Sequence, residues 1–394
     1  MTFWLRASCA AVCLVSTVQA VAKDAIPAVP PYVAAYQPQG VDERGVWMIA
    51  DEAERSLRDS KTLIGDTALN AYLRDVLCRT VGADRCGGVR LYVVRQALFN
   101  AFMTPNGTMV VYSGLLLRVR DEAELAAVLG HEFAHFELRH TLRGFQHTRS
   151  ATDIGAWAGL LAAGARTYGT AQSYQMIQLS AIGSIFSFNR DQERQADLLS
   201  MAYLKASPYD PRCFADIWLR LMDEADATAR GRRQRSKRYD RTAFFATHPP
   251  TLERATYLRD LATVMNKPGE DDAPRYDAKL AAWRRQFLAD QLKLNDFEGT
   301  DYLLGELARS GWTADLLFAR GELYRARGNP RDLVAAASFY RDAIGQDPAN
   351  AEAYRGLGLA QLRSRDPAGG DALRKYLAMR PDAPDGAMIS TLVQ

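Results

Sequence analysis

Two histidines four residues apart, with a glutamate directly after the first, are the residues of this sequence best suited to chemistry. They are His131, Glu132 and His135, in the segment His-Glu-Phe-Ala-His. Apolar residues around them recur at helical spacing without a proline, so we expect one helix. His131 and His135 are then one turn apart on one face, where two imidazoles can share a metal ion. Glu132 lies next to that face and can act as a base toward a water at the metal.

A zinc site needs a third protein ligand, and a catalytic one keeps its fourth position open. His140 is close in sequence. On a continuing helix, at about 100° per residue, it faces away from His131 and lies well off the face of His135. The metzincin pattern would need glycine at position 138 and histidine at 141, where this chain has Leu138 and Thr141. We therefore predict that His140 is not a ligand and that the metzincin class is excluded.

The better ligand is a carboxylate on a second predicted helix. Glu193 and Asp197 are four residues apart, so both project from one side of that helix. Glu193 would bind the metal. Asp197 would accept a hydrogen bond from the free ring nitrogen of a ligand histidine and fix its tautomer. Arg190, on the same stripe, could orient a carboxylate. Alone, the two carboxylates would form a solvated acidic face; with His131 and His135 they predict one zinc ion per chain.

Composition and the N-terminus limit the fold and the compartment. The 394 residues are 48% hydrophobic, enough for two or three domains, and a net charge of +3 is too small to argue for nucleic-acid binding.

Residues 1–22 have a short basic start, an uncharged stretch and a small-x-small site, which predicts a cleaved signal peptide. Residues 23–44 would form an extended lead-in. Cys78 and Cys86 could form a disulfide in an oxidising compartment or stay reduced.

A repeat in the C-terminal third predicts helical hairpins. Gly321 corresponds to Gly358 and Pro348 to Pro381, close to the period of about 34 residues of tetratricopeptide (TPR) repeats. A generic helical bundle is the alternative. Each hairpin must stack on its neighbour to bury its apolar face. We therefore expect this region to dock a substrate or a protein partner.

Two strands are predicted between the lead-in and the histidine motif. Residues 90–95 and 108–112 have strand patterns, with turn residues at 105–107. Asn100 and Ala101 would lie on an exposed backbone edge above the metal, where an unfolded peptide could add as a strand.

A long uncharged stretch follows the histidine motif and ends at Arg190. Its glutamines, serines and threonines suit lipid poorly. They favour helices that cover the cleft of the metal site rather than a segment that contacts the membrane.

Taken together, these motifs resemble the zinc metallopeptidase family that includes CAAX prenyl endopeptidases and heat-shock membrane proteases. The resemblance covers roughly residues 45 to 262 and implies peptide-bond hydrolysis with Glu132 as general base. The matching segments are His131–His135, Arg190–Asp197, Asn100–Phe102, Ser113–Leu116, and Thr247–Thr251 with Arg254.

The resemblance also implies a branch of the family and a role for His248. A signal peptide, the lack of obvious membrane spans and the repeats point to a soluble periplasmic branch that takes part in outer-membrane quality control. Prenylated substrates are not expected. His248 would lie near the metal and stabilise the oxyanion, or bind zinc at rest and displace the water. A loop histidine without such a role is the alternative.

We therefore predict an α+β, mostly helical protein with two domains. Residues 45–265 would form an HExxH zincin (gluzincin-like) protease domain with a small β-sheet, followed by an all-α TPR-like domain at 275–394. We expect a periplasmic zinc endopeptidase of misfolded or stalled envelope proteins, whose repeats contact the outer-membrane assembly machinery. The alternative is a chaperone or assembly adaptor with a latent protease site, although an intact Glu132 and ligand set argue against a pure adaptor.

Overall fold

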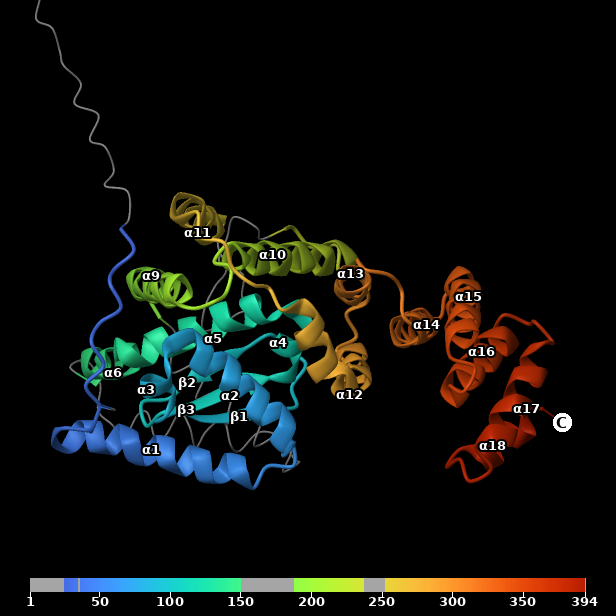
Figure 1. The fold of residues 1–394 in the computed structure, drawn as a ribbon. Helices are drawn as coiled ribbons and strands as arrows, with labels where there is room; N and C mark the ends of the chain where they lie inside the picture. The colour runs from blue at the N-terminus through green and yellow to red at the C-terminus, as the bar shows by residue number, and fades with distance from the viewer. Residues whose placement is uncertain (1–24, 35, 150–187, 237–251, 394) are drawn as a thin grey trace, which may run out of the picture.

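A computed structural model describes residues 25–34, 36–149, 188–236 and 252–393 (Figure 1). The predicted signal peptide, His248 and nearly all of the uncharged stretch before Arg190 lie outside the described residues. Among the residues that are described, no helix is long and apolar enough to cross a membrane.

A small three-stranded sheet lies in the N-terminal part. Its strands are β1 (Arg90–Val94), β2 (Ala101–Met103) and β3 (Thr108–Tyr112), in the order β1-β3-β2. The two predicted strands, β1 and β3, pair in parallel. The antiparallel partner of β3 is the short β2, which the sequence pattern does not indicate. The predicted turn residues connect β2 to β3, with Gly107 at φ 90°.

The two faces of the sheet pack against different helices (Figure 1). Alternate residues of a strand point to opposite faces. One set packs against α1 (Gly40–Arg58), where Val94, Phe102, Val110 and Tyr112 form one buried cluster with Leu57. The other set, which includes Val93, Met109 and Val111, joins the main core with α2 (Thr67–Val81) and α5 (Glu122–Glu137). Both faces are therefore covered.

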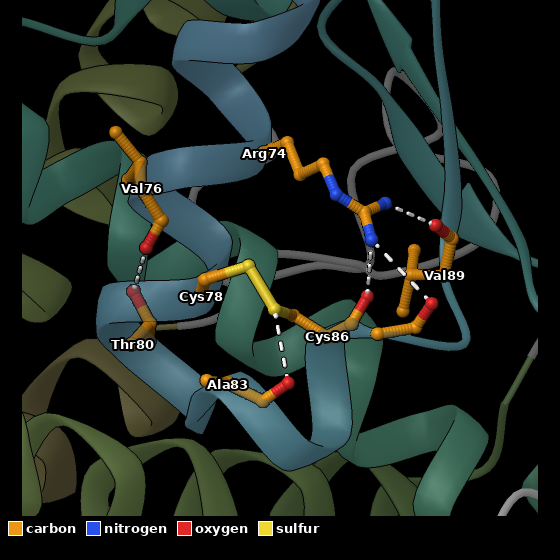
Figure 2. The surroundings of a disulfide bond; sticks show 8 residues. Arg74, Val76, Cys78, Thr80, Ala83, Cys86 and Val89 are labelled. Atoms are coloured by element: carbon orange, nitrogen blue, oxygen red, sulfur yellow. Dashed lines mark hydrogen bonds between the residues drawn. A yellow bond between two sulfur atoms is a disulfide. The ribbon is translucent and has the colours of Figure 1, made fainter.

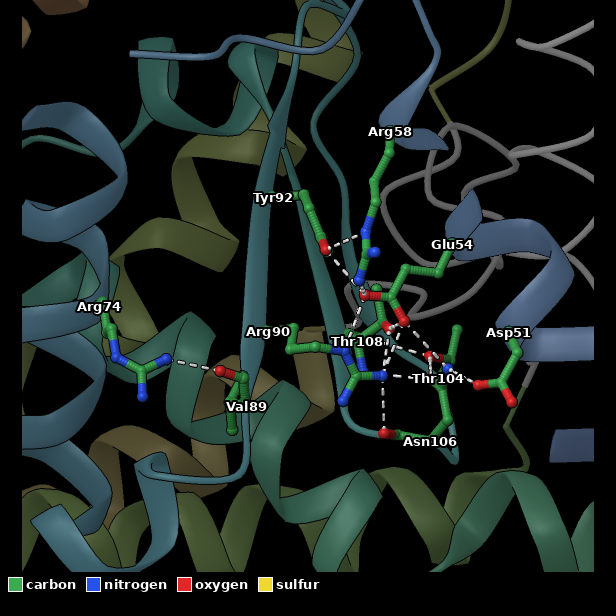
Figure 3. Close-up of polar contacts among 10 residues, drawn as sticks. All are labelled: Asp51, Glu54, Arg58, Arg74, Val89, Arg90, Tyr92, Thr104, Asn106 and Thr108. Carbon is green, nitrogen blue, oxygen red and sulfur yellow. Dashed lines mark hydrogen bonds and ion pairs between the residues drawn. The ribbon is translucent and has the colours of Figure 1, made fainter. Parts of the chain in front are cut away.

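A buried carboxylate fixes the β2–β3 turn against α1 (Figure 3). Glu54 of α1 accepts hydrogen bonds from Arg90 Nε and Nη2 (2.7 Å each), from Tyr92 (2.7 Å) and from Thr108 Oγ1 (2.9 Å). Burial alone would raise the pKa of Glu54, but these donors, with Arg58, hold it well below its usual range. Asn106 at the turn donates to the same carboxylate. This end of the sheet, and with it β2, is therefore held in place from α1.

Helix α5 is a buried helix with a defined start. The Asp121 side chain accepts from the backbone N–H of Glu124 at 2.7 Å and caps the helix. Residues 122–135 are all buried. A methyl group on Gly130 would lie 3.1 Å from Ser200 Oγ and 3.2 Å from Thr80, so glycine lets α5 pack closely against α9 (Arg190–Ala206) and α2.

The other helices of the N-terminal part surround this core. They are α3 (Ala83–Cys86), α4 (Ser113–Arg118), α6 (His140–Arg149), α10 (Cys213–Gly231) and α11 (Leu252–Met265).

The C-terminal residues form successive packed helices that extend to one side of the core (Figure 1). The repeated glycines make room for close packing: a methyl group on Gly321 would lie 2.7 Å from the buried Tyr340 ring, and one on Gly358 would lie 2.6 Å from Leu373. The helices are α12 (Ala273–Leu292), α13 (Phe297–Leu307), α14 (Ala314–Arg327), α15 (Pro330–Gln346), α16 (Ala351–Arg363), α17 (Gly369–Met379) and α18 (Gly386–Thr391).

A buried polar network joins these helices to the core. Arg118 at the end of α4 donates to both carboxylate oxygens of Glu224 on α10, at 2.8 and 2.6 Å. It also donates to Gln291 Oε1 of α12 (3.0 Å), and Gln291 donates to Thr300 of α13 (3.1 Å). All four side chains are buried. The first C-terminal helices are therefore anchored in the core rather than loosely tethered.

Cys78 and Cys86 form a disulfide between α2 and α3 (Figure 2). Arg74 supports the same corner, donating to the carbonyl oxygens of Val89 (2.6 Å) and Cys86 (3.2 Å). Of the two alternatives that the sequence allows, a disulfide or two reduced thiols, the structure therefore has the disulfide. Cys213 is a free cysteine.

We predict that this disulfide contributes measurably to stability. Replacing both cysteines (Cys78→Ser with Cys86→Ser) should lower the free energy of unfolding by about 2–3 kcal/mol, since a cross-link across a short loop removes a limited amount of unfolded-state entropy. Urea unfolding followed by circular dichroism measures it. Dithiothreitol should destabilise the parent protein and leave the double variant unchanged; equal sensitivity of both would contradict the prediction.

Candidate metal centre

Three ligand atoms from α5 and α9 converge at one buried point. His131, His135 and Glu193 each offer one atom, and the three lie within 4.8 Å of one another. The Nε2 atoms of His131 and His135 are 3.1 Å apart. The Glu193 carboxylate lies 3.5 Å from His131 Nε2 and 3.6 Å from His135 Nε2. All three side chains are at most 5% exposed. The structure thus brings together the three predicted ligands.

This arrangement fits zinc. Tetrahedral zinc with bonds of about 2.0–2.1 Å places its ligand atoms about 3.3–3.4 Å apart. The two histidine nitrogens are 3.1 Å apart, and the nearest Glu193 oxygens are 3.5 Å (Oε2, to His131 Nε2) and 3.6 Å (Oε1, to His135 Nε2) away, all close to that value. Two imidazoles and one carboxylate are also the ligand set of a type of catalytic zinc site that leaves one position for water and substrate.

Asp197 lies behind His131. Its Oδ1 is 3.0 Å from His131 Nδ1, so the other ring nitrogen, Nε2, faces Glu193 and His135. Burial alone would lower the pKa of His131, whereas the hydrogen bonds and charges of Asp197 and Glu193 raise it. The contact is the one expected of a carboxylate that fixes a ligand histidine's tautomer.

The arginine that contacts these carboxylates is Arg254 of α11, not Arg190. Arg254 donates to Asp197 from Nε (2.8 Å) and Nη2 (2.7 Å), and its Nη1 is 2.8 Å from Glu193 Oε2. Its guanidinium also lies 4.6 Å from the centre of the Trp218 ring. Burial alone would raise the pKa of Asp197, but Arg254 and His131 hold it below its usual range. Arg190 is exposed at the first turn of α9.

His140 lies inside the cluster because α5 does not continue through it. The helix ends at Glu137, Arg139 adopts a left-handed conformation (φ 56°), and α6 begins at His140. This turn brings His140 Nδ1 to 2.9 Å from His135 Nδ1. The prediction that His140 faces away was therefore wrong, since it assumed one straight helix. His140 is nonetheless outside the ligand set, and burial lowers its pKa to about 4, so its ring is neutral at pH 7.

The remaining predicted residues lie around the ligands. Glu132 is buried, 3% exposed, and directly follows His131 on α5. Ala101 pairs with Val111, and the Asn100 carbonyl accepts from Tyr112 N at 3.0 Å. Ala101 is only 3% exposed, so the expected exposure of this strand edge is not observed.

Sequence reasoning missed Arg254, Tyr257 and His140 as parts of the site. Tyr257 donates to Asp197 from one turn beyond Arg254. Arg254 was visible only as the last member of the segment that starts at Thr247. A continuous helix would turn His140 away from the ligands, and no glycine or proline in the sequence indicates the left-handed turn before it.

Comparisons with known proteins agree with this geometry. A family model described as "Peptidase family M48" matches residues 65–262. A putative beta-barrel assembly-enhancing protease of Vibrio cholerae is 32% identical over 240 residues, which are 59% of this chain and 47% of that protein. The mitochondrial metalloendopeptidase OMA1 of Schizosaccharomyces pombe is 30% identical over 191 residues, 48% of this chain and 52% of that protein. The chain thus spans about half the length of these two relatives.

We predict that Arg254→Met destabilises the metal-free protein strongly. It removes the guanidinium that contacts both the buried Glu193 and the buried Asp197 carboxylate, and removing one partner of a buried ion pair typically costs about 3–5 kcal/mol. Zinc brings positive charge to the same place, so the loss should be smaller in the zinc-loaded protein. Thermal and urea unfolding of both forms measure the difference.

The matched control is Arg259→Met on the same helix. Arg259 and its partner Asp216 are 3.6 Å apart and both more than half exposed, so we expect a loss of less than about 1 kcal/mol with or without zinc. Equal losses for the two variants would contradict the prediction.

Proposed function

Because this chain belongs to peptidase family M48, a family of zinc metallopeptidases, we propose that it is an exported zinc endopeptidase that hydrolyses misfolded or stalled envelope proteins, outer-membrane proteins among them. The observation that carries the proposal is the buried set of His131, His135 and Glu193, with Glu132 on the same helix. The export and periplasmic location rest on residues 1–22 of the sequence.

The proposed reaction divides its tasks among the residues of the site. Zinc, when bound, polarises the scissile carbonyl and lowers the pKa of a water molecule to about 7. Glu132 takes the proton of the attacking water and delivers it to the leaving amine. Asp197 keeps the proton of His131 on Nδ1, so Nε2 is available as a ligand atom. We assign His248 a role as oxyanion stabiliser or as a resting-state ligand that shuts the site.

We propose that substrates bind in extended form beside β2, at Asn100 and Ala101. β2 is at one end of the strand order and packs against α5, which carries the histidines. Recognition through backbone hydrogen bonds tolerates many side chains, which suits an enzyme of unfolded proteins. Because residues 101–103 are buried, the atoms that cover this edge must move before a peptide can pair there.

For the C-terminal helices we propose a docking role as TPR-like repeats. The successive packed helices, with Gly321 against Tyr340 and its counterpart Gly358 against Leu373, suit stacked repeats of about 34 residues. The name of the Vibrio cholerae relative refers to β-barrel assembly, which supports a partner in the outer-membrane assembly machinery. A chaperone or adaptor with a latent protease site is the second candidate, and the buried edge of β2 is the observation that favours it.

We predict that the purified chain without residues 1–22 binds one zinc ion and cleaves unfolded casein. Glu132→Gln should keep the zinc and lose cleavage by at least about 100-fold, since it removes the general base and leaves the ligands in place. Metal analysis and gel-based cleavage assays measure the two properties. Absence of zinc in the parent protein would contradict the ligand assignment, and zinc without cleavage would point to a closed site, with His248→Ala as the next variant.

In cells, two variants separate protease from adaptor. Glu132→Gln removes the chemistry, and deletion of residues 329–394 removes α15 to α18 while keeping the main core up to Leu323. If only the deletion impaired envelope assembly, the adaptor function would replace the protease function as the leading proposal.

A further inference from the structure

We propose that His140 is a positioning residue for the zinc site, holding His135 in the tautomer whose Nε2 is free to bind the metal. This inference rests on the proposed zinc peptidase and deepens it, because Asp197 serves only one of the two ligand histidines.

The contacts of His140 place it between His135 and α9. Its Nδ1 is 2.9 Å from His135 Nδ1, and its Nε2 is 3.3 Å from Gln195 Oε1. The two imidazole rings meet edge to face, with centres 4.9 Å apart. His140 is 1% exposed and therefore shielded from bulk water. These two contacts supply the hydrogen-bond partners that its buried ring nitrogens need.

The order of donors and acceptors follows from these contacts. An amide oxygen only accepts, so the hydrogen between His140 and Gln195 belongs to His140 Nε2. In a neutral imidazole the other nitrogen then accepts, so His140 Nδ1 takes a hydrogen bond from His135 Nδ1–H. His135 Nε2 is left without a proton, 3.1 Å from His131 Nε2.

The opposite order would disable the site. If His140 Nδ1 donated, His135 Nδ1 would have to accept, and the proton of His135 would sit on Nε2, facing His131 and Glu193. A protonated Nε2 cannot bind a metal. The tautomer of His135 is therefore coupled to the orientation of His140.

The structure also fixes His140 itself. The left-handed turn at Arg139 starts α6 at this residue, and Gln192 of α9 donates to the His140 carbonyl at 3.4 Å. On the other side, the Phe188 ring stacks on His135, with centres 3.8 Å apart and planes 20° from parallel. His135 is thus held by an acceptor at Nδ1 and by an aromatic ring on its face.

The first test reads the tautomers directly in the metal-free parent protein, labelled with ¹⁵N-histidine. The chain has five histidines, so long-range proton–nitrogen spectra can be assigned with single variants. We expect His135 to carry its proton on Nδ1 and His140 on Nε2. A proton on Nε2 of His135 would overturn the proposal without any variant having to fold.

The second test compares zinc affinity, by competition with a chelating dye, in three variants. His140→Phe keeps an aromatic ring and removes the acceptor, and we expect affinity to fall about 10- to 100-fold, the usual effect of losing such a partner. His140→Asn places an amide oxygen close to the Nδ1 position, so it should retain most of the affinity. Gln195→Leu leaves His140 Nδ1 in place and should have a smaller effect than His140→Phe.

The outcomes separate this inference from the proposed function. Unchanged zinc affinity in His140→Phe, or equal losses in His140→Phe and His140→Asn, would overturn the positioning role while the parent enzyme stays active. If the parent itself bound no zinc, the proposed function would fail first. If His140→Phe does not fold, the histidine tautomers of the parent protein and the zinc affinity of His140→Asn still test the positioning role of His140.

Discussion

Helix α5 is buried along nearly its whole length, and it carries charged and polar groups into that interior. A buried charge without a partner is costly, so each group must meet a complementary one on a neighbouring helix. Glu122 at its start accepts from Arg79 and Arg275, both at 2.9 Å, and Glu124 pairs with Arg220 of α10. Near its other end, His131 and His135 face Glu193 of α9. These polar pairs, together with apolar packing, set the position and rotation of the helix that holds the histidines.

The metal site brings several buried carboxylates close together. Glu193 and Asp197 both contact the Arg254 guanidinium, and the buried Glu132 follows His131 on α5. The negative charge of these carboxylates attracts positive charge to the point where the three ligand atoms converge. The electrostatics of the site therefore favour a divalent cation there. Arg254, stacked over Trp218, is fixed by packing as well as by charge.

The sequence predicted the parts of the site that depend on spacing within one helix. His131 with His135, and Glu193 with Asp197, are each one turn apart, and helix geometry alone places each pair on one face. Arg254 could not be derived in this way, because its contact with Asp197 joins residues 57 positions apart on different helices. His140 was misplaced because a non-glycine residue, Arg139, takes the left-handed conformation. Strand β2 has only three residues, too few for an alternating pattern to be visible.

Helix α10 connects the metal site with the C-terminal helices. Its Phe214 and Trp218 rings lie 6.0 and 6.4 Å from the His131 ring, centre to centre. One turn and a half further along, Glu224 holds Arg118, which also contacts Gln291 of α12.

The same Arg118 donates to the carbonyl oxygen of Ala97, three residues before Asn100, at 3.1 Å. Arg118 is buried and donates to groups on α10, on α12 and before β2, so this one side chain fixes the relative positions of the three segments.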